Sequence, residues 1–221
     1  MHPEVSVIVA TKNSARYLDE ALASITEQPL TAIELIVVDA GSSDGSVDIA
    51  RKFGARVIAQ STGRLAAAWN LGIAEARAPI IGFLDSDDRW VAQTLRARLD
   101  SLSADRSAVS VGRVRLFLEP GYSIPPGLNP ATIGPEFQAP IPGTMLVSRP
   151  ILDRIGRFDD AFLIASDVDW VGRALAQGVE MLPFDGLVLE KRIHAANLSL
   201  SSKVSSPELL RALRTRISKA R

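Results

Sequence analysis

The stretch 33-IELIVVDAGSSDG-45 decides the fold class. It opens with a short β-branched apolar run, which predicts a buried core strand. Asp39 closes this strand, and a turn of glycines and small polar residues leads into an expected helix. Comparable apolar runs, each of a length suited to a strand, stand at 5–10, 56–59 and 79–84.

Helices are expected between these strands. Asn13 is expected to cap the first helix and Pro29 to end it, and two more helices are expected at 46–53 and 63–76. The alternation predicts right-handed crossovers and an open, mostly parallel, twisted α/β sheet flanked by helices on both faces. Ligands of such sheets bind beyond the carboxyl ends of the strands. We therefore expect a site at this edge, where Thr11, Asp39 and the cluster 85–88 all follow strands.

The second half of the chain is less regular and predicts a smaller mixed region. Residues 119–142 contain seven prolines and are expected to form a long loop, the kind that is usually functional or mobile. The other elements expected here are helices at 90–102, 151–155 and 167–177 and strands at 108–118, 143–148, 179–183 and 187–193.

Composition excludes several classes of protein. The 221 residues include 47% hydrophobic residues and no cysteine, which rules out disulfide scaffolds, zinc–thiolate sites, iron–sulfur clusters and cysteine nucleophiles. The 25 basic residues balance the 25 acidic ones, so nothing favours nucleic acid as a partner. Neither phosphate-binding glycine motif, of a P-loop ATPase or of a dinucleotide dehydrogenase, is present.

Cellular location is predicted from what the sequence lacks. It shows no signal-peptide pattern and no apolar run near the roughly 20 residues that span a bilayer, so a cytoplasmic protein is expected. Residues 206–221 predict a terminal helix with leucines on one face and basic residues opposite. This helix either packs on the domain or makes peripheral contact with anionic lipid at the inner face of the membrane, and both interpretations stay open.

The cluster Asp85-Ser86-Asp87-Asp88 is the first candidate for chemistry. Three carboxylates in four residues repel one another, so a cluster that is even partly buried needs a cation. Carboxylate oxygens suit hard ions such as Mg²⁺ or Mn²⁺, which also bind substrate phosphates. A surface turn in which Asp88 caps the next helix is the competing interpretation, and the position at a strand end favours the metal.

Three further positions are candidates. The Asp39 carboxylate is placed to accept a hydrogen bond from a base or a ribose hydroxyl, whereas Asp44 is better explained by turn chemistry. Asp167 and Asp169 diverge by about 200° on a helix, so one is a candidate base while the other caps or pairs with a basic residue. Structural N-capping of the helix is the competing interpretation. His194 taken alone is more often structural than functional.

Taken in order, these residues resemble the family 2 glycosyltransferases with the GT-A fold. The resemblance rests on 5-VSVIVATKN-13, 37-VVDAGSSDGS-46, the helix residues from Gly63 to Ile73, 83-FLDSDD-88, 156-GRFD-159, 167-DVD-169, 192-RIH-194 and 197-NLS-199. Two positions depart from the family pattern: Ala40 replaces the second Asp of the family's V-V-D-D-G-S, and Ser166 stands where Glu is common.

The resemblance implies a role for each matching residue. Thr11, Asp39 and Arg64 would hold the nucleotide, and Asp85 and Asp87 would form the D-x-D motif that binds Mn²⁺ or Mg²⁺, with Asp87 as the direct ligand. Asp167 would be the general base, and His194 would approach the metal or the diphosphate. The departure at Ala40 leaves the identity of the nucleotide open.

The implied activity is an inverting, divalent-metal-dependent transfer of a hexosyl group from a nucleotide sugar. A UDP-sugar is the first expectation for the donor, and dTDP- and GDP-sugars are the alternatives. The expected acceptor is a hydroxyl of a carbohydrate, a lipid-linked molecule or a protein. The loop 119–142 is expected beside the acceptor site or as a spacer. A metal-dependent nucleotidyl or phosphoryl transferase and an inactive nucleotide-sugar-binding module are the alternatives.

The expected organisation is one transferase domain at 1–205, followed by the terminal helix. Within this domain a nucleotide-binding half at 1–90 precedes an acceptor and catalytic half at 91–205. The sequence does not disclose an oligomeric state.

Overall fold

The computed structural model describes residues 2–30, 32–104, 107–195 and 197. The strands are β1 (Val5–Thr11), β2 (Ile33–Asp39), β3 (Arg56–Ala59), β4 (Ile80–Asp85), β5 (Arg89–Trp90), β6 (Ala108–Leu118), β7 (Glu136–Gln138), β8 (Met145–Ser148) and β9 (Glu180–Ile193). The helices are α1 (Ala15–Thr26), α2 (Ser46–Lys52), α3 (Leu65–Glu75), α4 (Leu95–Ala104), α5 (Arg149–Ile155) and α6 (Ser166–Ala176), with 3₁₀ turns η1 (Pro130–Thr132) and η2 (Pro142–Thr144).

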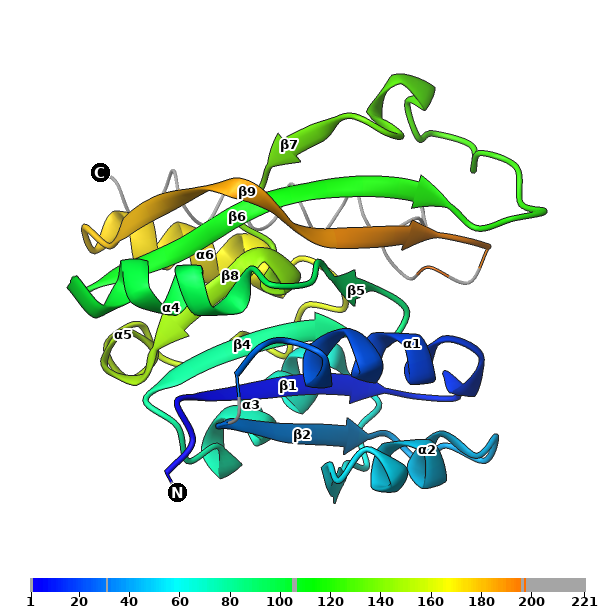
Figure 1. The fold of residues 1–221 in the computed structure, drawn as a ribbon, viewed down its shortest axis with the longest axis horizontal. Coiled ribbons are helices and arrows are strands. Elements are labelled where there is room, and N and C mark those ends of the chain that lie inside the picture. Colours follow the sequence, from blue (N-terminus) through cyan, green and yellow to red (C-terminus); the bar gives the residue numbers. More distant parts are fainter. Residues whose placement is uncertain (1, 31, 105–106, 196, 198–221) are drawn as a thin grey trace.

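One sheet runs through both halves of the chain in the order β3-β2-β1-β4-β8-β6-β9-β5, with β7 paired to β6 (Figure 1). β1 to β4 pair in parallel, as the alternation of strands and helices predicts. β8 is antiparallel to both β4 and β6, and this gives the second half its mixed character. The register sets Thr11 opposite Asp39 and Ala10 opposite Asp85, so the expected functional edge is formed.

Two apolar cores lie on the two faces of the sheet. Alternating side chains separate them, because successive residues of a strand point to opposite faces. On one face Val7 and Val9 of β1 pack with Leu18 of α1 and with residues of α2 and α4. On the other face Ile8 packs with Trp69 of α3 and with residues of α5 and α6. Both faces of the sheet are therefore covered, as expected for an α/β fold.

The region after β4 differs from the expected helix at 90–102. Arg89 and Trp90 pair as a short antiparallel strand with Glu190 and Leu189, and α4 begins only at Leu95. The partner strand is a hundred residues away, so local periodicity does not reveal this pairing. The strand pieces expected at 179–183 and 187–193 form the single strand β9, with register irregularities where it pairs with β6.

The start of α1 also differs from expectation. Asn13 does not cap it: this residue adopts φ 51°, and its Oδ1 accepts from the N–H of Ser43. The β2–α2 loop supplies the caps instead, since the N–H of Ala15 donates to Asp44 Oδ2 and the N–H of Ser14 donates to Ser46 Oγ. The turn chemistry expected of Asp44 thus serves a neighbouring helix.

Two expectations concern the ends and the loop. The terminal helix expected at 206–221 lies outside the described residues. Within the described residues, no helix combines the length and apolar character that crossing a membrane requires. The proline-rich segment 119–142 is not wholly irregular, because it contains η1 and the short strand β7.

Candidate active site

A cavity of about 550 Å³ opens at the carboxyl edge of the parallel strands. This volume falls in the range of pockets that bind small molecules. Its lining joins residues from both halves: Thr11 and Ala40 after β1 and β2, Arg64 before α3, the acidic loop 85–88, and Asp167 of α6. Residues far apart in sequence therefore share one cavity.

The acidic loop presents three carboxylates to one point. Asp85, Asp87 and Asp88 each offer an oxygen, and these oxygens lie within 4.8 Å of one another, close enough to share one metal ion. Their environments differ, because the side chain of Asp88 is 1% exposed while those of Asp85 and Asp87 are 32% and 22% exposed. The open pair matches the D-x-D positions that the family resemblance implies.

Lys191 of β9 lies among these carboxylates, and the sequence analysis did not identify it. Its Nζ donates to Asp88 Oδ2 at 3.0 Å and to Asp85 Oδ2 at 3.2 Å. Burial alone would lower the pKa of Lys191, but the carboxylates of Asp88 and Asp85 raise this pKa above its ordinary value. Burial raises the pKa of Asp88, and the nearby Lys191 ammonium opposes that rise.

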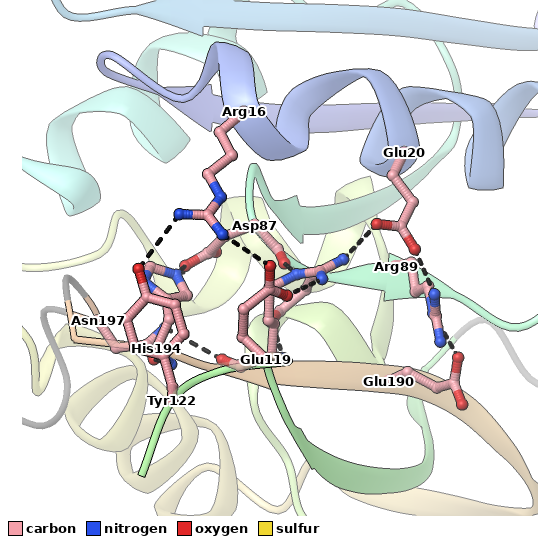
Figure 2. Close-up of polar contacts among 11 residues, drawn as sticks. Arg16, Glu20, Asp87, Arg89, Glu119, Tyr122, Glu190, His194 and Asn197 are labelled. Atoms are coloured by element: carbon pink, nitrogen blue, oxygen red, sulfur yellow. Dashed lines mark hydrogen bonds and ion pairs between the residues drawn. The ribbon is translucent and has the colours of Figure 1, made fainter. Parts of the chain in front are cut away.

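The neighbouring Arg192 holds the backbone of the same loop. Its Nε donates to the carbonyl of Asp87 at 2.9 Å, and its N–H donates to Asp88 Oδ1 at 2.8 Å. The buried guanidinium also pairs with Glu119 and Glu20. Figure 2 shows these pairs continuing outward, from Glu119 to Arg16 and Tyr122 and from Glu20 to Arg89 and Glu190. This ionic network fixes the position of the acidic loop.

His194 lies beside Asp87. Its Nε2 is 2.9 Å from Asp87 Oδ2, and the Asn197 amide donates to the same oxygen at 3.1 Å (Figure 2). The ring of Tyr17 lies against the His194 ring, with centroids 4.8 Å apart. His194 therefore contacts the expected metal ligand and orients it. Direct ligation of the metal by His194 stays a prediction.

Asp167 and Asp169 separate as the helical geometry predicts. Asp169 is buried and forms an ion pair with Arg173 one turn later, so it is structural. Asp167 lines the cavity, and its Oδ1 accepts from the N–H of Val168 at 2.8 Å. Burial raises the pKa of Asp167 from 3.8 to about 6, a value suited to accepting a proton near neutral pH.

Two of the three residues expected to hold a nucleotide, Thr11 and Arg64, line the cavity, whereas Asp39 is not among its lining residues. Thr11 is buried on the lining, and its Oγ1 has no hydrogen-bond partner among the described residues. Arg64 also lines the cavity and donates to the carbonyl of Asp160 at 2.9 Å. Asp39 accepts from the N–H groups of Gly41 and Ser42 and so shapes its own turn, and its contact with a nucleotide stays a prediction.

Asn70 explains why two of the quoted motifs occur together. Its side-chain amide donates to the carbonyl of Phe158 at 2.8 Å, and its Oδ1 accepts from the Phe158 N–H at 2.9 Å. This bidentate contact ties α3 to the loop 156–159. A helix of the nucleotide half thereby fixes the position of this loop.

Carboxylates and an orphaned hydroxyl around a cavity at the carboxyl edge of a parallel sheet define an α/β enzyme site. The model of the family described as Glycosyl transferase family 2 matches residues 6–164. The chain therefore belongs to this family, and the resemblance read from its motifs is confirmed. The family to which it belongs is one of transferases.

Comparison with one curated relative extends over most of the chain. It is 30% identical over 210 residues to the succinoglycan biosynthesis protein ExoU of Rhizobium meliloti (strain 1021), a match that covers 79% of this chain and 58% of that protein. The chain spans only part of its curated relatives, since three other matches cover 27%, 30% and 31% of theirs.

Two solved structures confirm the GT-A fold. S. aureus TarS 1–349 in complex with UDP-GlcNAc superposes with a TM-score of 0.77 at 23% identity, covering 96% of this chain and 65% of that one. The mannosyltransferase PcManGT from Pyrobaculum calidifontis, in complex with GDP-Man and Mn²⁺, gives a TM-score of 0.71 at 20% identity, covering 99% and 65%.

Proposed function

We propose that this protein transfers a sugar from a nucleoside diphosphate sugar to an acceptor hydroxyl with inversion at the anomeric carbon. One observation carries the proposal: a single cavity joins the acidic loop to Asp167, a carboxyl whose pKa is raised to about 6 by burial. The acidic loop suits a diphosphate with its metal, and Asp167 suits a general base. Family membership favours this activity over nucleotidyl or phosphoryl transfer.

The acidic loop fits a divalent cation. Its oxygens converge within 4.8 Å, and hard oxygen ligands are those that Mn²⁺ and Mg²⁺ prefer. Asp85 and Asp87 would hold the ion, with His194 and Asn197 orienting Asp87. When bound, such an ion stabilises the negative charge of the departing diphosphate. The Mn²⁺ present in the mannosyltransferase complex supports this assignment.

Asp167 removes the proton from the acceptor hydroxyl. The hydroxyl oxygen then attacks the anomeric carbon from the face opposite the diphosphate, and this direct displacement inverts the configuration. Burial keeps the Asp167 carboxylate basic enough to accept the proton, and the N–H of Val168 holds one of its oxygens. Positioned bases of this kind typically accelerate reactions by about 10²–10⁴-fold.

The nucleotide occupies the side of the cavity formed by Thr11 and Arg64. The unpartnered Thr11 hydroxyl is buried there, and a buried polar group without a partner is costly unless a ligand supplies one. Asp39 accepts hydrogen bonds in its own turn and keeps lone pairs for a base or ribose donor. The TarS complex with UDP-GlcNAc supports UDP as the nucleotide, and the GDP-Man complex keeps GDP as the alternative.

The acceptor approaches beside Asp167. The end of the proline-rich loop contributes Ile141, Pro142 and Gly143 to the cavity lining, which supports the acceptor-side role expected of this loop. A carbohydrate, a lipid-linked molecule or a protein remains the proposed class of acceptor. We propose likewise that the transferase domain ends at 205, that the protein is cytoplasmic, and that residues 206–221 contact lipid.

A panel of sugar nucleotides tests the activity. The full chain is incubated with UDP-, dTDP- and GDP-sugars, with Mn²⁺ or with EDTA, and the released nucleoside diphosphate is measured. Release that depends on Mn²⁺ and on one nucleotide is expected. Binding of UDP without any release would favour the inactive module, and release of pyrophosphate would favour a nucleotidyl transferase.

A further inference from the structure

Asp88 differs from the other two carboxylates of the acidic loop in how its oxygens are used. Its Oδ1 accepts from the N–H of Arg192 at 2.8 Å, and its Oδ2 accepts from Lys191 Nζ at 3.0 Å. Its side chain is 1% exposed. Both oxygens of Asp88 therefore have protein partners, and neither is open to solvent.

Asp85 and Asp87 each keep one oxygen for a ligand. Asp85 uses Oδ2 for Lys191, and Asp87 uses Oδ2 for His194 and Asn197. Within the described part of the chain, no donor contacts Oδ1 of either residue. These two side chains are also the exposed members of the cluster, at 32% and 22%.

The charges of the three aspartates and Lys191 also distinguish Asp88 from Asp85 and Asp87. Three carboxylates with one ammonium give a net charge of about −2, which one divalent cation neutralises. Among the described residues, Lys191 is the cationic side chain that pairs with the buried Asp88 carboxylate, and a buried unpaired charge is strongly unfavourable.

We propose that Lys191, by pairing with Asp88, keeps this carboxylate from coordinating a metal, so that Asp85 and Asp87 alone provide the carboxylates for a divalent ion. The inference rests on the proposed function, since it concerns the ion that a nucleoside diphosphate brings to this site. Lys191 acts here as a positioning residue. It decides which carboxylate oxygens are free to bind the ion and so leaves more coordination positions for diphosphate oxygens and water.

Replacing Lys191 should change the coordination of the metal. In Lys191→Met, Asp88 is released and enters the coordination shell, which displaces one water from the ion. We expect Mn²⁺ to bind about tenfold more tightly in the presence of UDP, because affinity rises with the number of charged ligands. The readouts are calorimetry for affinity and water-proton relaxation for the number of waters on Mn²⁺.

A charge-matched double variant guards against misfolding of the single one. Lys191→Met with Asp88→Asn removes both partners and keeps the net charge, so it should return affinity and water number to those of the unsubstituted chain. Lys12→Met is the control, because it removes another cation from the cavity lining without touching the acidic loop. Its Mn²⁺-bound water number should equal that of the unsubstituted chain.

The outcomes separate the two proposals. An unchanged water number in Lys191→Met, or a loss of Mn²⁺ affinity of more than about tenfold in the double variant, would show that Asp88 is itself a ligand and would overturn the inference. If the unsubstituted chain binds no Mn²⁺ with UDP, the metal site of the proposed function fails, and the inference fails with it.

Discussion

Two aspartates of α6 show how the fold assigns different chemistry to identical side chains. Asp169 is buried against Arg173, and its charge is used in an ion pair. Asp167 lies two residues earlier on the cavity lining, where desolvation raises its pKa to about 6. Asp167, which forms no ion pair within the described part of the chain, keeps the basicity that proton removal requires.

Replacement of this base should abolish transfer without affecting donor binding. We expect Asp167→Asn to lower the transfer rate by about 10²–10⁴-fold, because the amide cannot accept the proton. Affinity for UDP with Mn²⁺, measured by calorimetry, should stay within about threefold, since the proposed nucleotide contacts do not involve Asp167. Asp153→Asn, on the exposed face of α5, is the matched control. Full turnover by Asp167→Asn would remove the base assignment.

The acidic limb of the pH profile should report the same group. Asp167 acts only as the carboxylate, and its pKa is raised from 3.8 to about 6. Transfer efficiency should therefore be constant above this pH and fall by about tenfold for each pH unit below it. Measurement of kcat/KM from pH 4.5 to 8 checks this. A profile that stays flat down to pH 4.5 would contradict it.

At the scale of elements, the close packing of α3 on β1 places the nucleotide side of the site. A side-chain carbon at Gly72 would lie 2.4 Å from Ile8 Cγ2, far inside van der Waals contact. Glycine at this position lets the helix lie directly on the sheet. Arg64 at its start and Asn70 within it are thereby positioned at the cavity and at the loop 156–159.

Adding one methyl group at this contact should destabilise the protein. Gly72→Ala is expected to cost about 1–3 kcal/mol in the free energy of unfolding, because overpacking forces the helix outward. Helix propensity alone would predict a gain of about 1 kcal/mol for the same change. Urea denaturation decides between the two signs. A stabilised variant would mean that α3 and β1 are not in close contact.

For the whole molecule, the site lies where the parallel half and the mixed half of the sheet meet, so a bound ligand contacts both. Ligand binding to the folded state alone stabilises it by about 2.7 kcal/mol when the ligand is at 100 times its Kd. In a protein of this size, such a gain raises Tm by roughly 5–10 °C. A nucleotide with its metal should therefore stabilise the entire fold.

We expect UDP with Mn²⁺ to raise Tm by several degrees, and UDP with EDTA to raise it less. Asp87→Ala should remove the difference between the two conditions, because Asp87 is the proposed direct ligand. Differential scanning fluorimetry measures this, with Asp153→Ala as the control on an exposed surface. An Mn²⁺-dependent rise in Tm that persists in Asp87→Ala would show that the metal binds elsewhere.

The sequence by itself determined the parallel half of the fold and the edge that carries the site. Short apolar runs set β1 to β4 because burial of a strand depends on its own residues and their alternation. Thr11, Asp39 and Asp85 are the last residues of β1, β2 and β4, so parallel pairing brought them to one edge. The separation of Asp167 from Asp169 likewise follows from helical spacing.

Only the tertiary structure decided which partners these residues meet. Lys191 and Arg192 contact the acidic loop from about a hundred residues away, and the pairing of Trp90 with Leu189 depends on the same approach of β9. Such contacts have no local period in the sequence, because they arise from how the sheet is assembled. For that reason the sequence identifies three acidic residues, whereas the fold distinguishes Asp88, whose two oxygens both have protein partners, from the more exposed Asp85 and Asp87.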